Sequence, residues 1–150
     1  MSQEQPLRLL IVESRFYDDI ADELLAGAKD ALEAHEISYD VVTVPGAFEI
    51  PAAIAMAEDA AHRPMGKAYD GYVALGCVLR GPGFHFEIIA GESAHGLMRL
   101  SVDHGLCIGN GIIAADSEAQ ALQLAQESGG DAARACLALV ELRGRLGIYS

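Results

Sequence analysis

Positive charge is scarce in this sequence. Its 150 residues include 10 Lys and Arg against 22 Asp and Glu, so the formal net charge is −12. A nucleic-acid partner requires a basic surface that neutralises phosphates, and this composition argues against one. An anionic ligand would therefore have to be held by a few local groups.

Long apolar runs are absent as well, although 51% of the residues are hydrophobic. A membrane-spanning helix requires about 20 consecutive apolar residues, and no stretch of this chain approaches that length. We therefore expect no membrane partner. Excess apolar surface on a chain of this size is more typical of a contact between subunits, so we expect a homo-oligomer.

Cysteines are few and unclustered. Cys77, Cys107 and Cys136 lie in apolar surroundings, and none of them belongs to a C-x-x-C pair. An odd number of scattered cysteines is more typical of reduced thiols than of disulfides or zinc ligands. The N-terminal "MSQEQP" is polar and lacks the pattern of a signal peptide. These features predict a cytoplasmic protein without a metal.

What is present is a regular alternation of strand and helix patterns. We find no internal repeat, low-complexity segment or linker, and we expect one domain over residues 1–150. The expected strands are 7–13, 38–44, 71–78 and 106–114, and the expected helices begin at 18, 48 and 85 and cover 118–127 and 131–145, with a short connection at 128–130. This alternation predicts an α/β fold, a three-layer sandwich in which a four-stranded parallel sheet is flanked by helices.

Ligands of parallel α/β proteins bind at the carboxyl ends of the strands. In this chain those ends are segments 14–19, 44–49, 78–87 and 114–117. The unusual residues fall in the first three segments, which are therefore the expected ligand site.

Two of these segments carry residues with more than one interpretation. Phe16 and Tyr17 follow the first strand, and an aromatic residue there is either part of the core or a flat ring that stacks on a heterocycle. In "VPGAFEIP", Gly46 and Ala47 allow the backbone to approach a ligand just before a helix. Glu49 is either an acid favoured by the helix dipole or an acceptor for ligand hydroxyl groups.

The third segment contains "RGPGFHFE", a glycine-rich turn followed by a helix start. Free amides at a helix start suit an anion such as phosphate. His85 is either an exposed helix-start residue or a group that transfers protons near neutral pH. A metal site built from His85, Glu87 and His95 is disfavoured, because Glu87 would point away from His85 on a helix.

The motifs "SRF", "VPGAFEIP", "YDGYVALGCVLRG", "HFE" and "GNGII", in this order, resemble the lumazine synthase family over residues 7–147. The resemblance implies a flavodoxin-like chain that assembles into pentamers, with active sites between neighbouring subunits. It also implies a transferase of riboflavin biosynthesis. Such an enzyme condenses 5-amino-6-(D-ribitylamino)uracil, a ribityl-pyrimidine, with 3,4-dihydroxy-2-butanone 4-phosphate, a four-carbon sugar phosphate, without a cofactor.

The resemblance also assigns roles to individual residues. His85 would be the catalytic acid–base residue, with Asp131 near it, and the ring of Phe16 would stack on the pyrimidine. Segment 47–49 would hold the ring edge and the ribityl hydroxyl groups. The implied substrate-binding residues are Phe16, Gly46, Ala47, Phe48, Glu49, Cys77, Val78, Leu79, Arg80, Gly81, Pro82, Gly83, Asn110 and Leu124.

Three positions depart from the family pattern, all in the phosphate-binding part of the site. Gly83 stands in place of a threonine that binds phosphate, Leu124 in place of an arginine, and Ser128 is the nearest match to a lysine. The connection before Asp131 is also shorter by several residues. A charge-assisted hydrogen bond to phosphate contributes about 1.5–3 kcal/mol. Losing two cations therefore predicts phosphate-dependent catalysis weakened by about a hundredfold or more.

The sequence leaves other functions open. A weak or inactive paralogue could bind a lumazine or flavin, or act as an assembly scaffold. An enzyme could join a ribityl-pyrimidine to a non-phosphorylated carbonyl compound. A general nucleotide binder would leave "VPGAFEIP" unexplained. The short polar lead before the first strand favours a pentamer or a pair of pentamers over a capsid.

Overall fold

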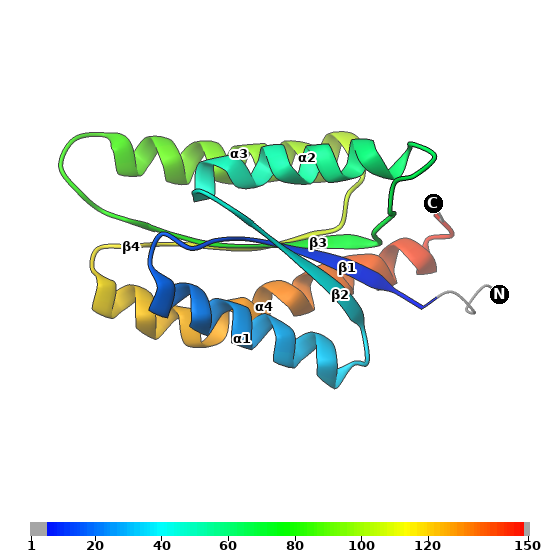
Figure 1. Ribbon diagram of the computed structural model, residues 1–150, viewed down its shortest axis with the longest axis horizontal. Helices are drawn as coiled ribbons and strands as arrows, with labels where there is room; N and C mark the ends of the chain where they lie inside the picture. Colours follow the sequence, from blue (N-terminus) through cyan, green and yellow to red (C-terminus); the bar gives the residue numbers. More distant parts are fainter. Residues whose placement is uncertain (1–5, 149–150) are drawn as a thin grey trace.

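Four parallel strands form the central layer of the protein, and helices cover both faces of the sheet (Figure 1). The computed structural model describes residues 6–148. Its elements are β1 (Arg8–Ser14), α1 (Asp18–Ala34), β2 (Ser38–Val44), the short 3-10 helix η1 (Ala47–Glu49), α2 (Ile50–Ala61), β3 (Gly71–Leu79), α3 (His85–His104), β4 (Ile108–Ala115) and α4 (Glu118–Arg145). Helices α2 and α3 lie on one face, and α1 and α4 on the other. The predicted three-layer α/β fold is confirmed.

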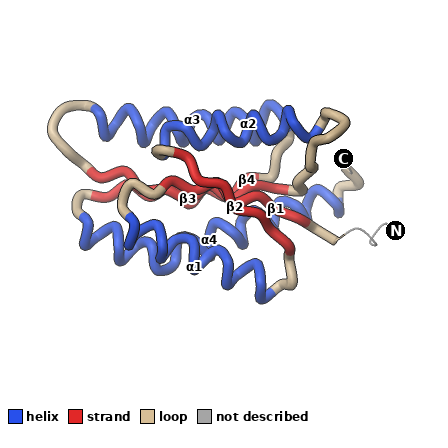
Figure 2. Tube along the Cα trace, in the orientation of Figure 1, coloured by secondary structure: helices blue, strands red, loops and turns tan. Residues whose placement is uncertain are grey.

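The order of the strands places a switch point in the middle of the sheet. The order is β2-β1-β3-β4, and β1 pairs in parallel with both β2 and β3. The chain therefore moves from β1 to one edge of the sheet and then crosses back to the other side. The loops that follow β1 and β3 diverge at one end of the sheet, drawn in tan at the left of Figure 2. Ligand sites of such sheets lie at this point.

Each face of the sheet has its own apolar core. Along β1, Leu9 and Ile11 belong to the core shared with α1 and α4, whereas Leu10 and Val12 belong to the core shared with η1, α2 and α3. Side chains of a strand alternate between its two faces, and a central strand of a parallel sheet is buried on both. This double burial explains why the sequence of β1 reads as a continuous apolar run.

The end of the chain differs from the prediction. Residues 118–145 form one continuous helix, α4, so the prediction of two helices joined at 128–130 is wrong. Gly129 and Gly130 are buried where α4 packs against α1. A Cβ atom on Gly129 would lie 2.0 Å from the carbonyl oxygen of Leu24, and one on Gly27 would lie 3.1 Å from the amide nitrogen of Gly130. The glycines thus permit a close helix contact, and this packing outweighs their low helix propensity.

Two other helix boundaries bear on the site. Helix α3 runs from His85 to His104 and is capped by Gly105, which has the left-handed φ of 67° typical of a helix C-terminus, as predicted. The helix expected from residue 48 is divided, because Ala47–Glu49 forms a 3-10 turn before α2 starts at Ile50. Pro51 lies in the first turn of α2, where its missing N–H costs nothing.

The structure also bears on the expectations for membrane helices, for the cysteines and for the N-terminal lead. Within residues 6–148, no helix is long and apolar enough to cross a membrane. The cysteines are not joined by disulfides; Cys77 is half-buried, and Cys107 and Cys136 are buried. The polar lead that bears on the assembly falls largely on residues 1–5, which lie outside the described part of the chain.

Candidate active site

A pocket of about 530 Å³ lies where β1, β2 and β3 end, at the switch point of the sheet. Ligand pockets for small molecules have volumes of about 300–1,000 Å³ and are mostly apolar. The described residues that line this one are Phe16, Tyr17, Pro45, Gly46, Ala47, Phe48, Glu49, Cys77, Val78, Leu79, His85 and Ile89. The structure therefore brings together most of the residues that the sequence assigned to the pyrimidine and to proton transfer.

The β1–α1 loop supplies an aromatic wall. The ring of Phe16 is 75% exposed, so the interpretation of Phe16 as a core aromatic is excluded. Its ring meets that of Tyr17 edge to face, with centroids 4.8 Å apart and planes at 86°. Because most of Phe16 is exposed, its ring is available for stacking on a planar ligand.

The β2–α2 segment supplies the opposite wall. Gly46 is extended, and the 3-10 turn that follows buries Ala47 against the sheet while Phe48 and Glu49 stay exposed. A Cβ atom on Gly46 would lie 3.2 Å from Oε1 of Glu49, so the carboxylate lies close to this backbone. In the described structure Glu49 precedes α2 without a side-chain capping hydrogen bond. Its oxygens are therefore available to a ligand.

The end of β3 forms the floor of the pocket. Cys77, Val78 and Leu79 line it, and Gly76 lets the strand approach its neighbours, since a Cβ atom there would lie 2.8 Å from Oγ of Ser14. Burial raises the pKa of the Cys77 thiol to about 11. A thiol with such a pKa is protonated at neutral pH and is a poor nucleophile. Cys77 therefore lines the floor of the pocket and does not act as a nucleophile.

His85 lies at the rim of this pocket, at the first residue of α3. It is exposed, and it follows a turn in which Gly83 has a φ of 79°. Glycine adopts this left-handed conformation without strain, whereas a threonine would be strained there. A threonine with its phosphate-binding hydroxyl group would therefore be strained at position 83 of this turn.

Arg80 does not line the described pocket, and its charge is already engaged. Its Nε lies 2.8 Å from a carboxylate oxygen of Asp116, and its Nη1 lies 3.0 Å from one of Glu87. Its guanidinium group also lies over the ring of Phe86, 4.4 Å from the centroid. One cation beside two carboxylates offers no net positive charge to a phosphate group.

The remaining predicted residues lie apart from the pocket in the described chain. Residues 81–83 form an exposed turn beside it. Asn110 is exposed on β4, where its Oδ1 accepts a hydrogen bond of 2.9 Å from the amide of Ile112. Leu124 is partly exposed on α4. Asn110 and Leu124 therefore do not line the pocket of the described chain, whereas residues 81–83 lie next to it.

Asp131 is also separated from His85 within one chain. It lies on α4, beyond the opposite face of the sheet from α3, about 20 Å along the helix from its start. Its carboxylate pairs with Arg134 at 2.7 Å, and both side chains are exposed. The described chain alone therefore does not form the predicted pair of His85 and Asp131.

Ile89 is the pocket residue that lies outside the segments expected to bind a ligand. Tyr17 and Pro45 lie within two of those segments, although neither was assigned a role as a substrate-binding residue. Ile89 lies four residues after His85, and residues at this spacing share a helix face. Among residues 6–148, no group of three His, Cys, Asp or Glu side chains is placed to hold a metal ion.

The fold and the pocket define the class of this protein, a parallel α/β protein with a small-ligand pocket at the switch point of its sheet. The family model for 6,7-dimethyl-8-ribityllumazine synthase matches residues 6–144, and the chain belongs to that family. Its curated relatives include 6,7-dimethyl-8-ribityllumazine synthase 1 of Rhizobium meliloti (strain 1021), 54% identical over 98% of both chains. The corresponding synthase of Agrobacterium fabrum is 55% identical over 93% of this chain and 96% of its own. That of Nitrobacter hamburgensis is 58% identical over 93% of this chain and 87% of its own. The resemblance found in the sequence is confirmed.

Proposed function

We propose that this protein is a transferase that condenses 5-amino-6-(D-ribitylamino)uracil with 3,4-dihydroxy-2-butanone 4-phosphate to form 6,7-dimethyl-8-ribityllumazine in riboflavin biosynthesis. Family membership over residues 6–144 supports the reaction. The observation that carries the proposal is that Phe16, segment 46–49, segment 77–79 and His85 line one and the same pocket. No cofactor enters the reaction.

The pocket walls would hold the ribityl-pyrimidine. Phe16 offers an exposed ring to the planar pyrimidine, and the backbone of segment 77–79 faces its edge. Glu49 would accept hydrogen bonds from ribityl hydroxyl groups, because its carboxylate makes no capping bond in the described chain. Holding both reactants in one orientation supplies much of the rate enhancement of a condensation.

His85 would move protons during the reaction. The amine of the pyrimidine attacks the ketone to form a Schiff base with loss of water, and phosphate is then eliminated. The second nitrogen closes the ring by attacking the remaining carbonyl group, with loss of a second water. Each step needs a proton to be taken up or released, and imidazole does both near neutral pH. The position of His85 at the pocket rim supports this role.

We also propose that the phosphate is bound weakly. Gly83 has no hydroxyl group, Leu124 and Ser128 have no charge, and Arg80 is engaged by two carboxylates. The amides at the start of α3 remain to meet the anion. The same observations favour a second candidate, a paralogue that binds the pyrimidine or a lumazine with little turnover.

Assembly and location complete the proposal. We place the active site between subunits of a cytoplasmic homo-oligomer, a pentamer or a decamer, in which the chain is one domain. Exposed apolar side chains on α2 and α3, among them Met56, Met98 and Val102, support a subunit contact. Light scattering of the purified protein would give its mass in solution.

A turnover assay tests the proposal. Both substrates are mixed with the purified protein and lumazine formation is followed by absorbance, in parallel with a calorimetric titration of the pyrimidine alone. Turnover with a high KM for the butanone phosphate is expected. Pyrimidine binding without turnover would favour the second candidate, and turnover with an ordinary family KM would contradict the weak phosphate site. Absence of pyrimidine binding would refute both candidates.

A further inference from the structure

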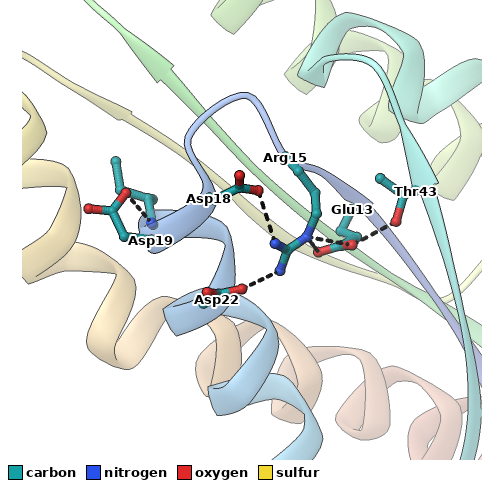
Figure 3. Close-up of polar contacts among 7 residues, drawn as sticks. Glu13, Arg15, Asp18, Asp19, Asp22 and Thr43 are labelled. Atoms are coloured by element: carbon teal, nitrogen blue, oxygen red, sulfur yellow. Dashed lines mark hydrogen bonds and ion pairs between the residues drawn. The ribbon is translucent and has the colours of Figure 1, made fainter.

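Arg15 lies directly before Phe16 in the sequence and forms the centre of a polar network with Glu13, Asp18 and Asp22 (Figure 3). We propose that Arg15 is a positioning residue that fixes the β1–α1 loop so that the ring of Phe16 stands ready to stack on the pyrimidine. This inference rests on the proposed function for the identity of the ligand. In the described chain Arg15 does not line the pocket, so it would act through Phe16.

All three nitrogens of the guanidinium group of Arg15 are engaged. Nε donates to both carboxylate oxygens of Glu13, at 3.1 and 3.0 Å. Nη1 donates to Asp18 at 3.2 Å, and Nη2 donates to Asp22 at 2.7 Å. These partners belong to the end of β1 and to the first two turns of α1 (Figure 3). Arg15 therefore links the two elements that flank its own loop.

Glu13 anchors this network in the sheet. The residue is only 3% exposed, and its Oε2 also accepts a hydrogen bond of 2.7 Å from the hydroxyl group of Thr43 on β2. A buried carboxylate is held in place by partners of this kind, because an unpaired one is costly. Strand β2 leads into segment 46–49, the opposite wall of the pocket. The buried carboxylate of Glu13 is thus hydrogen-bonded to the β1–α1 loop through Arg15 and to the strand that leads into segment 46–49 through Thr43.

Phe16 itself has little packing to fix it. The residue is 75% exposed, and its ring forms an edge-to-face pair with that of Tyr17. The position of such a ring depends on the backbone of its loop. A ring that is already oriented before binding costs less conformational entropy when the ligand arrives. Arg15 would supply this orientation.

The geometry requires an arginine. Its planar fork presents five donors in fixed directions, whereas a lysine is a point charge at the end of a flexible stem. In Arg15→Lys the ammonium group could still neutralise the buried Glu13, but it could not span Glu13, Asp18 and Asp22 at once. The variant therefore keeps a positive charge beside the buried Glu13, but it removes the hydrogen bonds that join the end of β1 to the start of α1.

Titration calorimetry with 5-amino-6-(D-ribitylamino)uracil on the assembled protein tests the proposal. We expect Kd to rise about tenfold in Phe16→Ala, which loses the stacked ring, and by a similar factor in Arg15→Lys. The double variant should bind no more than about threefold more weakly than Phe16→Ala, because both changes remove one interaction. Arg63→Lys is the matched control, since Arg63 pairs with exposed Asp59 at the far end of α2 and should keep the wild-type Kd.

Two results would overturn the proposal: a wild-type Kd in Arg15→Lys, or losses of affinity that multiply in the double variant. Should Arg15→Lys fail to fold, Asp22→Asn replaces it, because Asp22 is an exposed partner and its loss leaves Glu13 paired. A smaller rise in Kd is then expected, and an unchanged Kd counts against the proposal.

Hydrogen exchange without any ligand separates this inference from the proposed function. The amides of residues 15–17 should exchange faster in Arg15→Lys than in wild type and the Arg63→Lys control, while the core of β1 keeps its protection. Unchanged exchange would show that Arg15 does not hold the loop. Failure of the wild-type protein to bind the pyrimidine, with faster exchange in the variant, would instead refute the proposed ligand and leave the loop contact established.

Discussion

The glycine contact between α1 and α4 predicts opposite effects for two Gly→Ala changes in the same helix. A Cβ atom on Gly129 would lie 2.0 Å from the carbonyl oxygen of Leu24, a backbone atom that cannot rotate away. A Cβ atom on Gly144, further along α4, would meet nothing within 4 Å in the described structure. Gly129→Ala should therefore separate two packed helices, whereas Gly144→Ala changes only helix propensity.

The expected changes in unfolding free energy follow from overpacking and from helix propensity. Overpacking costs about 1–3 kcal/mol of unfolding free energy, and alanine regains about 1 kcal/mol of helix propensity. The net loss in Gly129→Ala is thus about 0–2 kcal/mol, which lowers Tm by up to about 8 °C for a chain of this size. Gly144→Ala should instead gain about 0.5–1 kcal/mol, which raises Tm by about 1–4 °C.

Differential scanning fluorimetry or calorimetry measures both effects, and the protomer concentration has to be kept constant because assembly stabilises the folded chain. A Tm for Gly129→Ala that equals or exceeds that of Gly144→Ala would refute the close helix contact. It would favour a break at residues 128–130, as the sequence pattern alone predicted.

Further predictions concern the chemistry of the site. His85→Ala should lower kcat by about a hundredfold or more while the Kd of the pyrimidine stays near its wild-type value, and a loss in Kd alone would contradict an acid–base role. Leu124→Arg should raise kcat/KM for the butanone phosphate by about tenfold, and Leu142→Arg on the same helix should not; equal effects would count against a phosphate site. Because the Cys77 thiol has its pKa raised to about 11, its alkylation by iodoacetamide should stay slow through pH 9 and accelerate above pH 10. Half-maximal rates near pH 8.5, typical of a free thiol, would contradict this burial.

The part of the site that could be predicted from the sequence consists of residues placed by local signals. Segment 46–49 follows a β-branched strand and precedes a helix, and His85 follows a glycine turn at the next strand end. Each position depends on where a strand stops, and the parallel sheet then brings these ends together. The pocket could therefore be anticipated without knowledge of any contact between distant side chains.

The parts that could not be predicted depend on contacts between distant residues. Gly129 and Gly130 are typical of a helix break in isolation, and only the carbonyl group of Leu24, about 100 residues earlier, explains their place inside α4. Likewise Glu13 interrupts an apolar strand, but its partner Thr43 is 30 residues away. The polar network behind Phe16 therefore becomes visible only in the folded chain.

The position of Asp131 also depends on how distant parts of the chain pack, and could not be predicted from local sequence. The family resemblance predicts that it lies near His85, whereas α4 carries it past the opposite face of the sheet in a single chain. A pairing of Asp131 with His85 therefore stays a prediction that depends on the assembly.

The most direct test of the central claim is a crystal structure of the protein with 6,7-dimethyl-8-ribityllumazine bound. We expect the lumazine ring against Phe16, the ribityl chain at Glu49 and the ring edge along segment 77–79, with His85 beside the newly formed ring. A lumazine bound away from this pocket, or bound within it with its ring away from Phe16, would contradict the account.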